Sequence, residues 1–509
     1  MLNDIIKNNN GPCNAKIKNF SFHPQNRNLP FFKSKSLTFS NTLKLSSLAC
    51  FLLLVLIKTN VSAKNFYLSG SQGNDRMAGT SADQPWKSLQ KLGQINFNPG
   101  DRILLKSGDT FTGAIHLENL QGAEGQEIVI GTYGGDARAI IHGKDTRAAI
   151  FILNPSYVRI ENLEVTNPGN QYGILMEARS AGELQNVTLA NLDVHDVFDE
   201  AFERTNTPKT RGGIVFKVEG DDKPSWWDGI VIENSVVHDL GSCGISIGSD
   251  YKVNKDPESD EKRYPILGVR IRNNIIHDIV RDGAIIRQCK GAIIENNEVY
   301  RTGLTSVSNG IWFYDSDSCI IQNNIGHHCK AAHDKDGAPF SLDNHTTNCI
   351  IQYNYSHSNE GAGYMLFGHN DTEHGNIIRH NISYNDVTNI ASDGIGAIAI
   401  VSRVKDALVY DNVIIAGPAT QSILGHRDWD GLPVEVNYEN NLFVGNGTAY
   451  FDKDVMQGGN FKDNFFINVV DLPEALQNDD GNRVSDYYQK LQQKIIELDS
   501  INSYNIEKY

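Results

Sequence analysis

The chain has 509 residues, of which 40% are hydrophobic, and its 46 lysines and arginines against 61 aspartates and glutamates give a formal net charge of -15. This apolar content supports a large folded core or two domains, and it excludes a globally disordered chain and a polytopic membrane protein. The acidic balance excludes general nucleic-acid binding.

The first 63 residues differ from the rest in charge and pattern. They carry eight basic residues and one acidic residue, a net charge of +7, and an apolar run over 45–57 that precedes Val61, Ser62 and Ala63. This order predicts a signal peptide behind a long N-terminal extension, with cleavage after Ala63. A single membrane anchor is the alternative, although the run is shorter than the ~20 residues of a typical span. We expect an exported protein, in the periplasm of a bacterium, at its surface or outside the cell.

An internal repeat runs from about residue 158 to residue 467. Its units alternate apolar and polar positions around an asparagine, as in VRIRNNIIHD and CIIQNNIGHH, and most recur after roughly 20 to 30 residues. Such a unit is strand, turn and strand, too short to hold a crossover helix. One column through the units reads Leu163, Leu192, Ser235, Asn274, Asn297, Asn324, Asn354, Asn381, Asn412, Asn441 and Asn464. The repeat predicts an all-β solenoid, a parallel β-helix over residues 64–470, with the asparagines stacked as amide ladders.

A second column consists of glycines that open the next strand of each unit. Its members are Gly173, Gly213, Gly244, Gly283, Gly310, Gly337, Gly363 and Gly394. We interpret them as turn residues that need a positive φ. Alternate positions counted from each glycine point outward, and the fourth residues after them are Lys217, Gly248, Arg287, Tyr314, Ser341 and Phe367.

The ends of the solenoid carry a different pattern. Residues 486–500, within a tail over 471–509, have helical apolar spacing, and residues 86–95 are expected to form a short helix as well. Solenoids need such caps over their open ends. The cysteines after residue 63 are five and widely spaced, which argues against a disulfide framework, and Cys319 and Cys349 occupy the same place in successive units. We expect these two to form part of a buried stack.

Three segments near the start carry a family resemblance: NFYLSGSQGND, DQPWKSLQKL and PGDRILLKSGDTFTG. They resemble the N-terminal cap and first coil of the pectate-lyase-like superfamily of secreted carbohydrate-active enzymes, and the resemblance covers residues 65 to 470. It implies a right-handed, single-stranded parallel β-helix. The superfamily includes lyases, hydrolases, epimerases and adhesive proteins, so it does not fix the reaction. GISIGS at 244–249 is similar to a polygalacturonase strand, but Cys243 stands where that family has a catalytic histidine.

Basic and aromatic residues on the expected outward face favour a uronate-containing, or sulfated, glycan such as pectin, alginate or ulvan. Such cations hold carboxylate or sulfate groups and aromatic rings stack on sugars, so the candidates for substrate binding are Lys217, Arg403, Trp312, Trp226 and His345. β-Elimination, by a lyase or a uronate dehydratase, is the favoured reaction. It needs a cation on the carboxylate, a base and an acid, for which the candidates are Arg287, then His369 or His333, and Tyr314.

Glycoside hydrolysis is the second interpretation, because two carboxyl groups must flank the glycosidic bond. Asp336 and Asp343 lie seven residues apart across one glycine-marked turn, with Asp315 one coil away. The same three carboxylates are candidates for a Ca²⁺ site, since hard cations take several carboxylate oxygens. A non-catalytic module for adhesion or carbohydrate binding is a third interpretation.

Histidines fall into two classes. Those that recur at one turn are expected to be structural, and they are His195, His238, His277, His327 and His357, with Tyr300 and Tyr384 in the same column. Four histidines outside the column, His333, His345, His369 and His426, are the candidates for function. No glycine-rich phosphate loop precedes a helix, so we expect no nucleotide cofactor. A monomer with a glycan as its partner is expected.

Overall fold

The computed structural model describes residues 62–144, 146–169, 171–198, 209–220, 222–250, 263–331, 336–369, 372–389 and 394–477. The chain divides into two units, Met1–Val61 and Ser62–Tyr509, and the description concerns the second. The signal peptide and the helix expected over 486–500 lie outside the described residues and stay predictions. Within the described part, no helix is long and apolar enough to cross a membrane.

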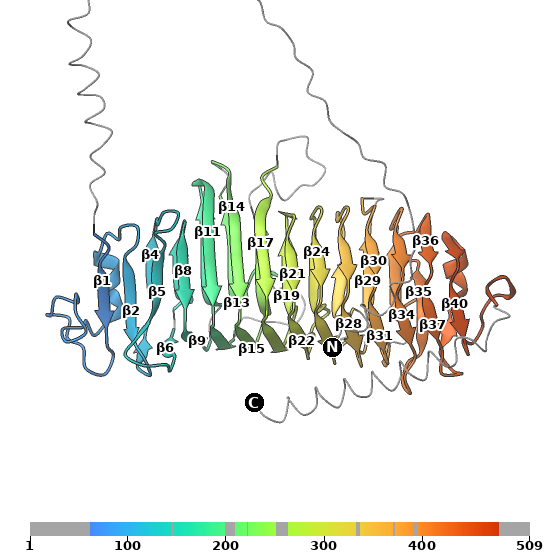
Figure 1. Ribbon diagram of the computed structural model, residues 1–509, viewed down its shortest axis with the longest axis horizontal. Helices are drawn as coiled ribbons and strands as arrows, with labels where there is room; N and C mark the ends of the chain where they lie inside the picture. The colour runs from blue at the N-terminus through green and yellow to red at the C-terminus, as the bar shows by residue number, and fades with distance from the viewer. Residues whose placement is uncertain are drawn as a thin grey trace, which may run out of the picture. The chain divides into compact units, whose positions relative to one another are not determined.

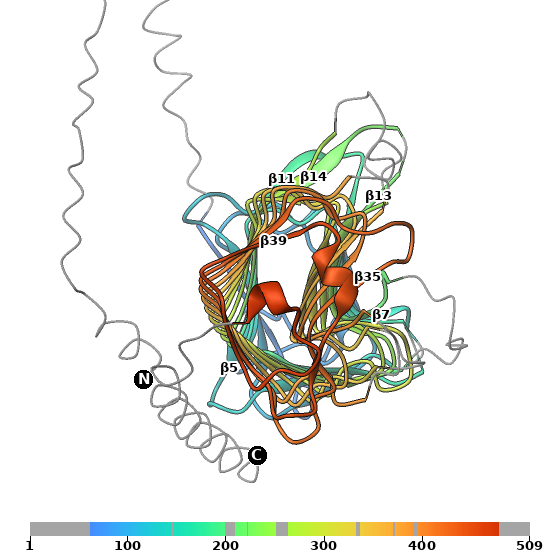
Figure 2. The same ribbon diagram turned by 90° about the vertical axis from the view of Figure 1, so that its right-hand side faces the viewer.

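The second unit is a solenoid of three parallel sheets, along which the coils follow one another in chain order (Figure 1). Viewed along its axis, the strands of successive coils superimpose into walls around a common interior (Figure 2). Sheet A contains β1 (Asn65–Leu68), β2 (Arg102–Lys106), β5 (Ile128–Tyr133), β8 (Val158–Glu161), β11 (Gly182–Ala190), β14 (Ser225–Glu233), β17 (Ile266–Arg272), β21 (Ile293–Glu295), β24 (Ile320–Gln322), β27 (Ile350–Gln352), β30 (Ile377–Arg379), β33 (Leu408–Tyr410), β36 (Val436–Glu439) and β39 (Gly459–Lys462), with β20 (Cys289–Lys290) beside β17.

The other two sheets follow the same order. Sheet B contains β3 (Thr110–Thr112), β6 (Ala139–His142), β9 (Leu163–Asn167), β12 (Asp193–Val197), β15 (Val236–Leu240), β18 (Ile275–Ile279), β22 (Glu298–Tyr300), β25 (Ile325–His327), β28 (Tyr355–His357), β31 (Ile382–Tyr384), β34 (Val413–Ile415), β37 (Leu442–Val444) and β40 (Phe465–Ile467). Sheet C contains β4 (Ile115–Glu118), β7 (Ala148–Leu153), β10 (Tyr172–Arg179), β13 (Gly212–Glu219), β16 (Cys243–Ser249), β19 (Ala284–Arg287), β23 (Ile311–Tyr314), β26 (Phe340–Leu342), β29 (Tyr364–Gly368), β32 (Ile398–Ser402), β35 (Ser422–Arg427) and β38 (Tyr450–Phe451).

The interior is filled by the alternate apolar residues of each strand. In sheet A, for example, Ile294, Ile321, Ile351 and Ile378 are fully buried one above another, because β21, β24, β27 and β30 pair in register. Side chains on a strand alternate between its two faces, so the residues before and after each of these isoleucines in its own strand point outward. The period of 2 in the sequence therefore reports the inward and outward faces correctly, and the predicted parallel β-helix is confirmed.

The asparagine column forms the expected ladder between sheets A and B. Asn354 donates its amide to Asn381 Oδ1 at 3.1 Å, and its own Oδ1 accepts from the backbone N–H of Asn324 at 2.9 Å and from the Asn324 amide at 3.0 Å. The same pattern runs from Asn274 to Asn464. The ladder satisfies buried backbone groups at a turn that water does not reach.

The glycine column has a different cause from the one expected. Gly337 and Gly394 do have positive φ angles, of 77° and 81°. For Gly283, however, an added Cβ would lie 2.7 Å from the carbonyl oxygen of Gly310, and for Gly310 it would lie 2.6 Å from that of Pro339. The positive-φ interpretation is wrong for these two and also for Gly173, Gly213, Gly244 and Gly363, none of which has a positive φ. At Gly283 and Gly310 the backbone of the next coil leaves no room for a side chain instead.

Short 3₁₀-helices lie near both ends of the described part of the solenoid. η1 (Leu89–Gln94) lies within the predicted N-terminal helix and buries Leu89 and Leu92 in the main core, whereas η3 (Lys453–Met456) and η4 (Glu474–Leu476) follow late strands. The cysteine stack is confirmed: Cys319 and Cys349 are buried and reduced, and the Cys319 N–H approaches Cys349 Sγ at 3.4 Å.

Candidate active site

The strand register of sheet C places Asp343 beside Tyr314 on the outward face. Phe313 pairs with Leu342, so the residues that follow them, Tyr314 and Asp343, are neighbours. Counting from Gly337 puts Ser341 in this place, which is wrong by two residues, because Pro339 and not Gly337 aligns with Gly310. The corrected outward column reads Lys217, Gly248, Arg287, Tyr314, Asp343 and Phe367.

Asp343 is a carboxyl group with a strongly shifted acidity. Burial raises its pKa to about 7, and the negative charges of Asp336 and Asp282 raise it too, whereas a hydrogen bond from Ser341 Oγ at 2.5 Å and the charge of Lys209 lower it. Asp343 nevertheless keeps partial exposure to solvent on the outward face. A carboxyl group that holds its proton near neutral pH and is accessible is suited to general acid catalysis.

Asp282 is a third carboxylate of this region that the sequence did not single out. It is fully buried, accepts a hydrogen bond from Trp312 Nε1 at 3.0 Å and lies 3.6 Å from Lys209 Nζ. The Lys209 ammonium also lies over the Trp312 ring, 4.1 Å from its centroid. The predicted sugar-stacking role of Trp312 does not fit this geometry, because its ring is 3% exposed and is covered by Lys209. Trp312 instead holds Asp282 and Lys209 beside the site.

Tyr314 and His345 lie next to Asp343, as expected for site residues. Burial and the charge of Asp315 raise the pKa of the Tyr314 phenol, which remains partly exposed. The His345 ring meets the Tyr314 ring edge to face, with 6.1 Å between centroids. A ligand bound at Asp343 can therefore contact both side chains. The sequence had suggested Tyr314 as the acid of an elimination and His345 as a substrate-binding residue.

Arg287 is the neighbour of Tyr314 on the side away from Asp343. Its Nε is buried and has no hydrogen-bond partner in the described part of the chain. Burial lowers the pKa of this guanidinium, and the charge of Asp250 acts in the opposite direction. Its position on the outward face agrees with the prediction.

Lys217, Trp226 and Arg403 are not gathered around Asp343. The Lys217 ammonium is paired with Glu219 and lies 3.3 Å from Asp250. Trp226 belongs to sheet A, where its ring stacks on Tyr264 at 5.0 Å. Arg403 is exposed and follows β32. The basic ladder expected from the sequence is therefore partly neutralised by acidic partners.

The candidate histidines have separate locations. His369 follows β29, where its ring contacts Phe367 and its Nδ1 lies 3.6 Å from Asp430. His426 is buried, with Nε2 2.7 Å from the Tyr438 hydroxyl, and burial lowers its pKa to about 4, so the expectation of a functional role does not fit. His333 lies outside the described residues.

The Ca²⁺ site expected from Asp315, Asp336 and Asp343 is not formed by these residues. Asp315 is buried and bound by the Arg263 guanidinium, with Nη1 2.7 Å from Oδ1. Because this arginine occupies the carboxylate, Asp315 does not share a ligand position with the other two. In the part of the chain that the structure describes, no group of three His, Cys, Asp or Glu side chains is arranged to hold a metal ion.

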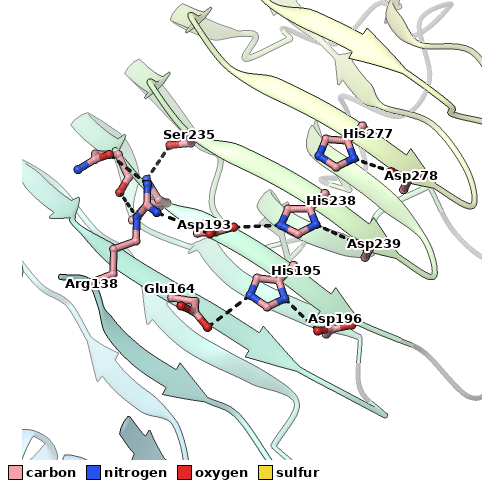
Figure 3. A network of polar contacts seen from close by, with 12 residues as sticks. Arg138, Glu164, Asp193, His195, Asp196, Ser235, His238, Asp239, His277 and Asp278 are labelled. Atoms are coloured by element: carbon pink, nitrogen blue, oxygen red, sulfur yellow. Dashed lines mark hydrogen bonds and ion pairs between the residues drawn. The ribbon is translucent and has the colours of Figure 1, made fainter. Parts of the chain in front are cut away.

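The recurring histidines form a stacked column on sheet B (Figure 3). Successive rings of His195, His238 and His277 have centroids 4.9 Å apart. The Nδ1 of each ring hydrogen-bonds to the carboxylate of the aspartate that follows it, as His238 does to Asp239 at 2.6 Å. Asp193 also reaches His238 Nε2 at 3.1 Å. These contacts repeat from coil to coil, in keeping with the structural role that was predicted.

Lys209 and Asp282 lay outside the sequence prediction. Asp282 directly precedes a glycine of the column and Lys209 stands in an insertion between repeats, so neither follows the strand alternation from which outward residues were counted. Trp429 was also missed. It is 50% exposed and contacts Phe367, the outward residue one strand beyond Asp343. The sequence feature that could have pointed to Trp429 is a tryptophan in a loop outside the regular strand pattern.

Comparison with known proteins gives the handedness of the β-helix. A family model for the right-handed beta helix region matches residues 210–414. The fold is a right-handed parallel β-helix. The resemblance seen in the N-terminal segments is thus confirmed at the level of the fold.

Individual relatives extend over more of the chain. A lacto-N-biosidase of Bifidobacterium longum subsp. longum is 25% identical over 84% of this chain and 32% of its own length, so the chain spans about a third of that relative. The crystal structure of a GH136 lacto-N-biosidase from Eubacterium ramulus superposes with a TM-score of 0.61 at 23% identity, covering 74% of this chain and 67% of that one. A mannuronic acid specific polysaccharide family 6 lyase from human gut microbiota gives 0.51 at 15% identity, covering 86% and 99%. The two structures show the fold alone.

Proposed function

We propose that this protein is a carbohydrate-active enzyme that hydrolyses a glycosidic bond, with Asp343 as the general acid and Asp336 as the second carboxylate. The observation that carries the proposal is the accessible carboxyl group of Asp343, whose pKa of about 7 lets it hold a proton at neutral pH. The curated relative supports it, because a lacto-N-biosidase is by its name a glycoside hydrolase.

The chemistry follows from the two environments. In a glycosidase one carboxylic acid protonates the leaving oxygen, and the other, ionised, either attacks the sugar or activates water. Asp343 has the raised pKa of the acid, and the charge of Asp336 helps to keep it protonated. The charge of Lys209 lowers the pKa of Asp343 and that of Asp282 raises it. Trp312 contacts both of these residues. Tyr314 lies beside Asp343, where its hydroxyl can hydrogen-bond to the substrate.

β-Elimination, which the sequence favoured, is the second candidate. It is supported by the adjacency of Arg287 and Tyr314, a cation and a proton donor on neighbouring strands. It lacks a placed base, because His369 lies with Phe367 and Asp430 beyond Asp343, and His333 is outside the described residues. The expectations of a monomer and of an anionic glycan stay predictions.

One assay separates the two reactions. The purified protein is incubated with uronate polysaccharides, their oligosaccharides and neutral galactose- and N-acetylhexosamine-containing oligosaccharides, while reducing ends and absorbance near 235 nm are followed. Hydrolysis gives new reducing ends and a mass gain of one water per cut, without a rise in absorbance. Asp343→Asn and Asp336→Asn should each lower the rate by about 100- to 10,000-fold. The control Asp406→Asn, at an exposed turn with a positive φ, should leave it unchanged. A rise near 235 nm would establish elimination instead.

A further inference from the structure

Arg287 stands out because its charge has no partner in the described structure. Its Nε is buried without a hydrogen bond to any described residue, and the guanidinium forms no ion pair with a described carboxylate. An arginine side chain stays protonated at all physiological pH values. A buried charge without a partner is costly and buried charges are normally paired, so a ligand that supplied an opposite charge to Arg287 would remove this cost.

Other cations of the region differ from Arg287 in this respect. Lys217 is paired with Glu219 and Asp250, Arg179 lies 3.3 Å from Glu219, Lys209 lies 3.6 Å from Asp282, and Arg263 is bound to Asp315. The surroundings of sheet C thus supply acidic partners to cations in general. Arg287, on the same face, has no such partner among the described carboxylates.

The backbone beside Arg287 is shaped around its guanidinium. Gly248 occupies the outward position one strand before it, and a Cβ there would lie 2.7 Å from Arg287 Nη2 and 2.8 Å from its Nε. A side chain at residue 248 would therefore displace the guanidinium. The residue as a whole keeps partial exposure, so a ligand can reach it from the outward face.

We propose that Arg287 binds an oxyanion of the substrate, a carboxylate or a sulfate ester on a sugar that neighbours the one cleaved at Asp343. This inference rests on the proposed hydrolysis for the position of the cleaved bond. Tyr314 separates Arg287 from Asp343 in the column, so the two Cα atoms are about two strand spacings, ~10 Å, apart. The planar guanidinium suits both oxyanions, because each presents two oxygens to its fork.

The test measures binding rather than turnover. Tri-galacturonate is compared with its methyl ester, and 6-sulfo-N-acetyllactosamine with N-acetyllactosamine, by calorimetry with the full chain. We expect at least one acidic probe to bind about 10-fold more tightly than its neutral partner, with the preference falling as salt is added. The pair that shows the preference identifies the oxyanion. Arg287→Met should abolish the preference and Arg287→Lys should keep part of it, whereas Arg272→Met, which removes a cation of sheet A paired with Glu233, should leave it intact.

Two further readouts make the outcome decisive. Arg287→Met should keep or raise the melting temperature, because it removes an unpaired buried charge, whereas a structural arginine would lower it. The proposal is overturned if neither acidic probe is preferred, or if Arg287→Met retains the preference. A preference that depends on Arg287 in a protein that releases no reducing ends would sink the hydrolysis and leave this inference standing. Hydrolysis of neutral glycans, with no preference for either acidic probe, would overturn the oxyanion inference and leave the proposed hydrolysis standing.

Discussion

At the scale of single residues, the acidity of Asp343 sets the pH dependence of activity. Its pKa of about 7 means that the protonated acid is lost as the pH rises through 7, so kcat/KM should fall on the alkaline side of that value. Ser341 Oγ donates to the ionised form and lowers this pKa. Ser341→Ala should therefore move the alkaline limb upward, by about 1 pH unit, since one hydrogen bond is worth about one unit of pKa.

A pH profile of initial rates between pH 5 and 9 checks this expectation. The matched control is Ser422→Ala in β35, a serine of the same sheet three strands from Asp343, whose hydroxyl bonds to Tyr450 O. The alkaline limb of the Ser422→Ala profile should stay at the same pH as in the unaltered protein. An unshifted limb in Ser341→Ala, with activity retained, would show that a group other than Asp343 governs the profile.

At the scale of elements, the asparagine ladder stabilises the turn between sheets A and B. Asn354 is buried, and its amide donates to Ile321 O, Gln352 O and Asn381 Oδ1 while its Oδ1 accepts from Asn324. Asn354→Ala leaves several of these buried groups without partners. We expect it to lower the free energy of unfolding by about 2 to 4 kcal/mol.

Urea unfolding followed by circular dichroism measures this effect. Asn437→Ala is the control, because Asn437 is outside the ladder and its amide bonds to Glu435 O at the surface. It should change the stability by less than about 0.5 kcal/mol. Equal effects of the two substitutions would contradict a specific role for the ladder.

The same elements explain how far the sequence predicts the fold and the site. Strand alternation and the asparagine column depend on neighbours in the chain and on a repeat, so they can be recognised in the sequence. They placed Tyr314 and Asp343 on the outward face of sheet C, as the strand register does. The register of sheet C depends on loop length between units, and one glycine, Gly337, displaced the count by two residues. Asp282 and Lys209 reach the site through a turn and an insertion, whose course no periodicity fixes.

At the scale of the whole molecule, the site belongs to a few consecutive coils of a solenoid in which each coil contacts its neighbours. Leu163 and Leu192 occupy equivalent positions, as do Asn297 and Asn324, because Glu164 pairs with Asp193 and Glu298 with Ile325. Deleting 163–191 or 297–323 therefore removes one coil without disturbing the register of the rest. The two deletions differ in their relation to Asp343.

Removal of 297–323 eliminates β23, with Tyr314 and Trp312, and brings β19 against β26. We expect this variant to fold and to lose activity by at least about 100-fold, because Asp282 and Lys209 lose Trp312 and the substrate loses Tyr314. Removal of 163–191 takes out β10, several strands away, and should lower the melting temperature while reducing ends are still released. Inactivity of a folded 163–191 deletion would extend the site toward Glu177 and the first coils. Activity of the 297–323 deletion would move it away from Tyr314 altogether.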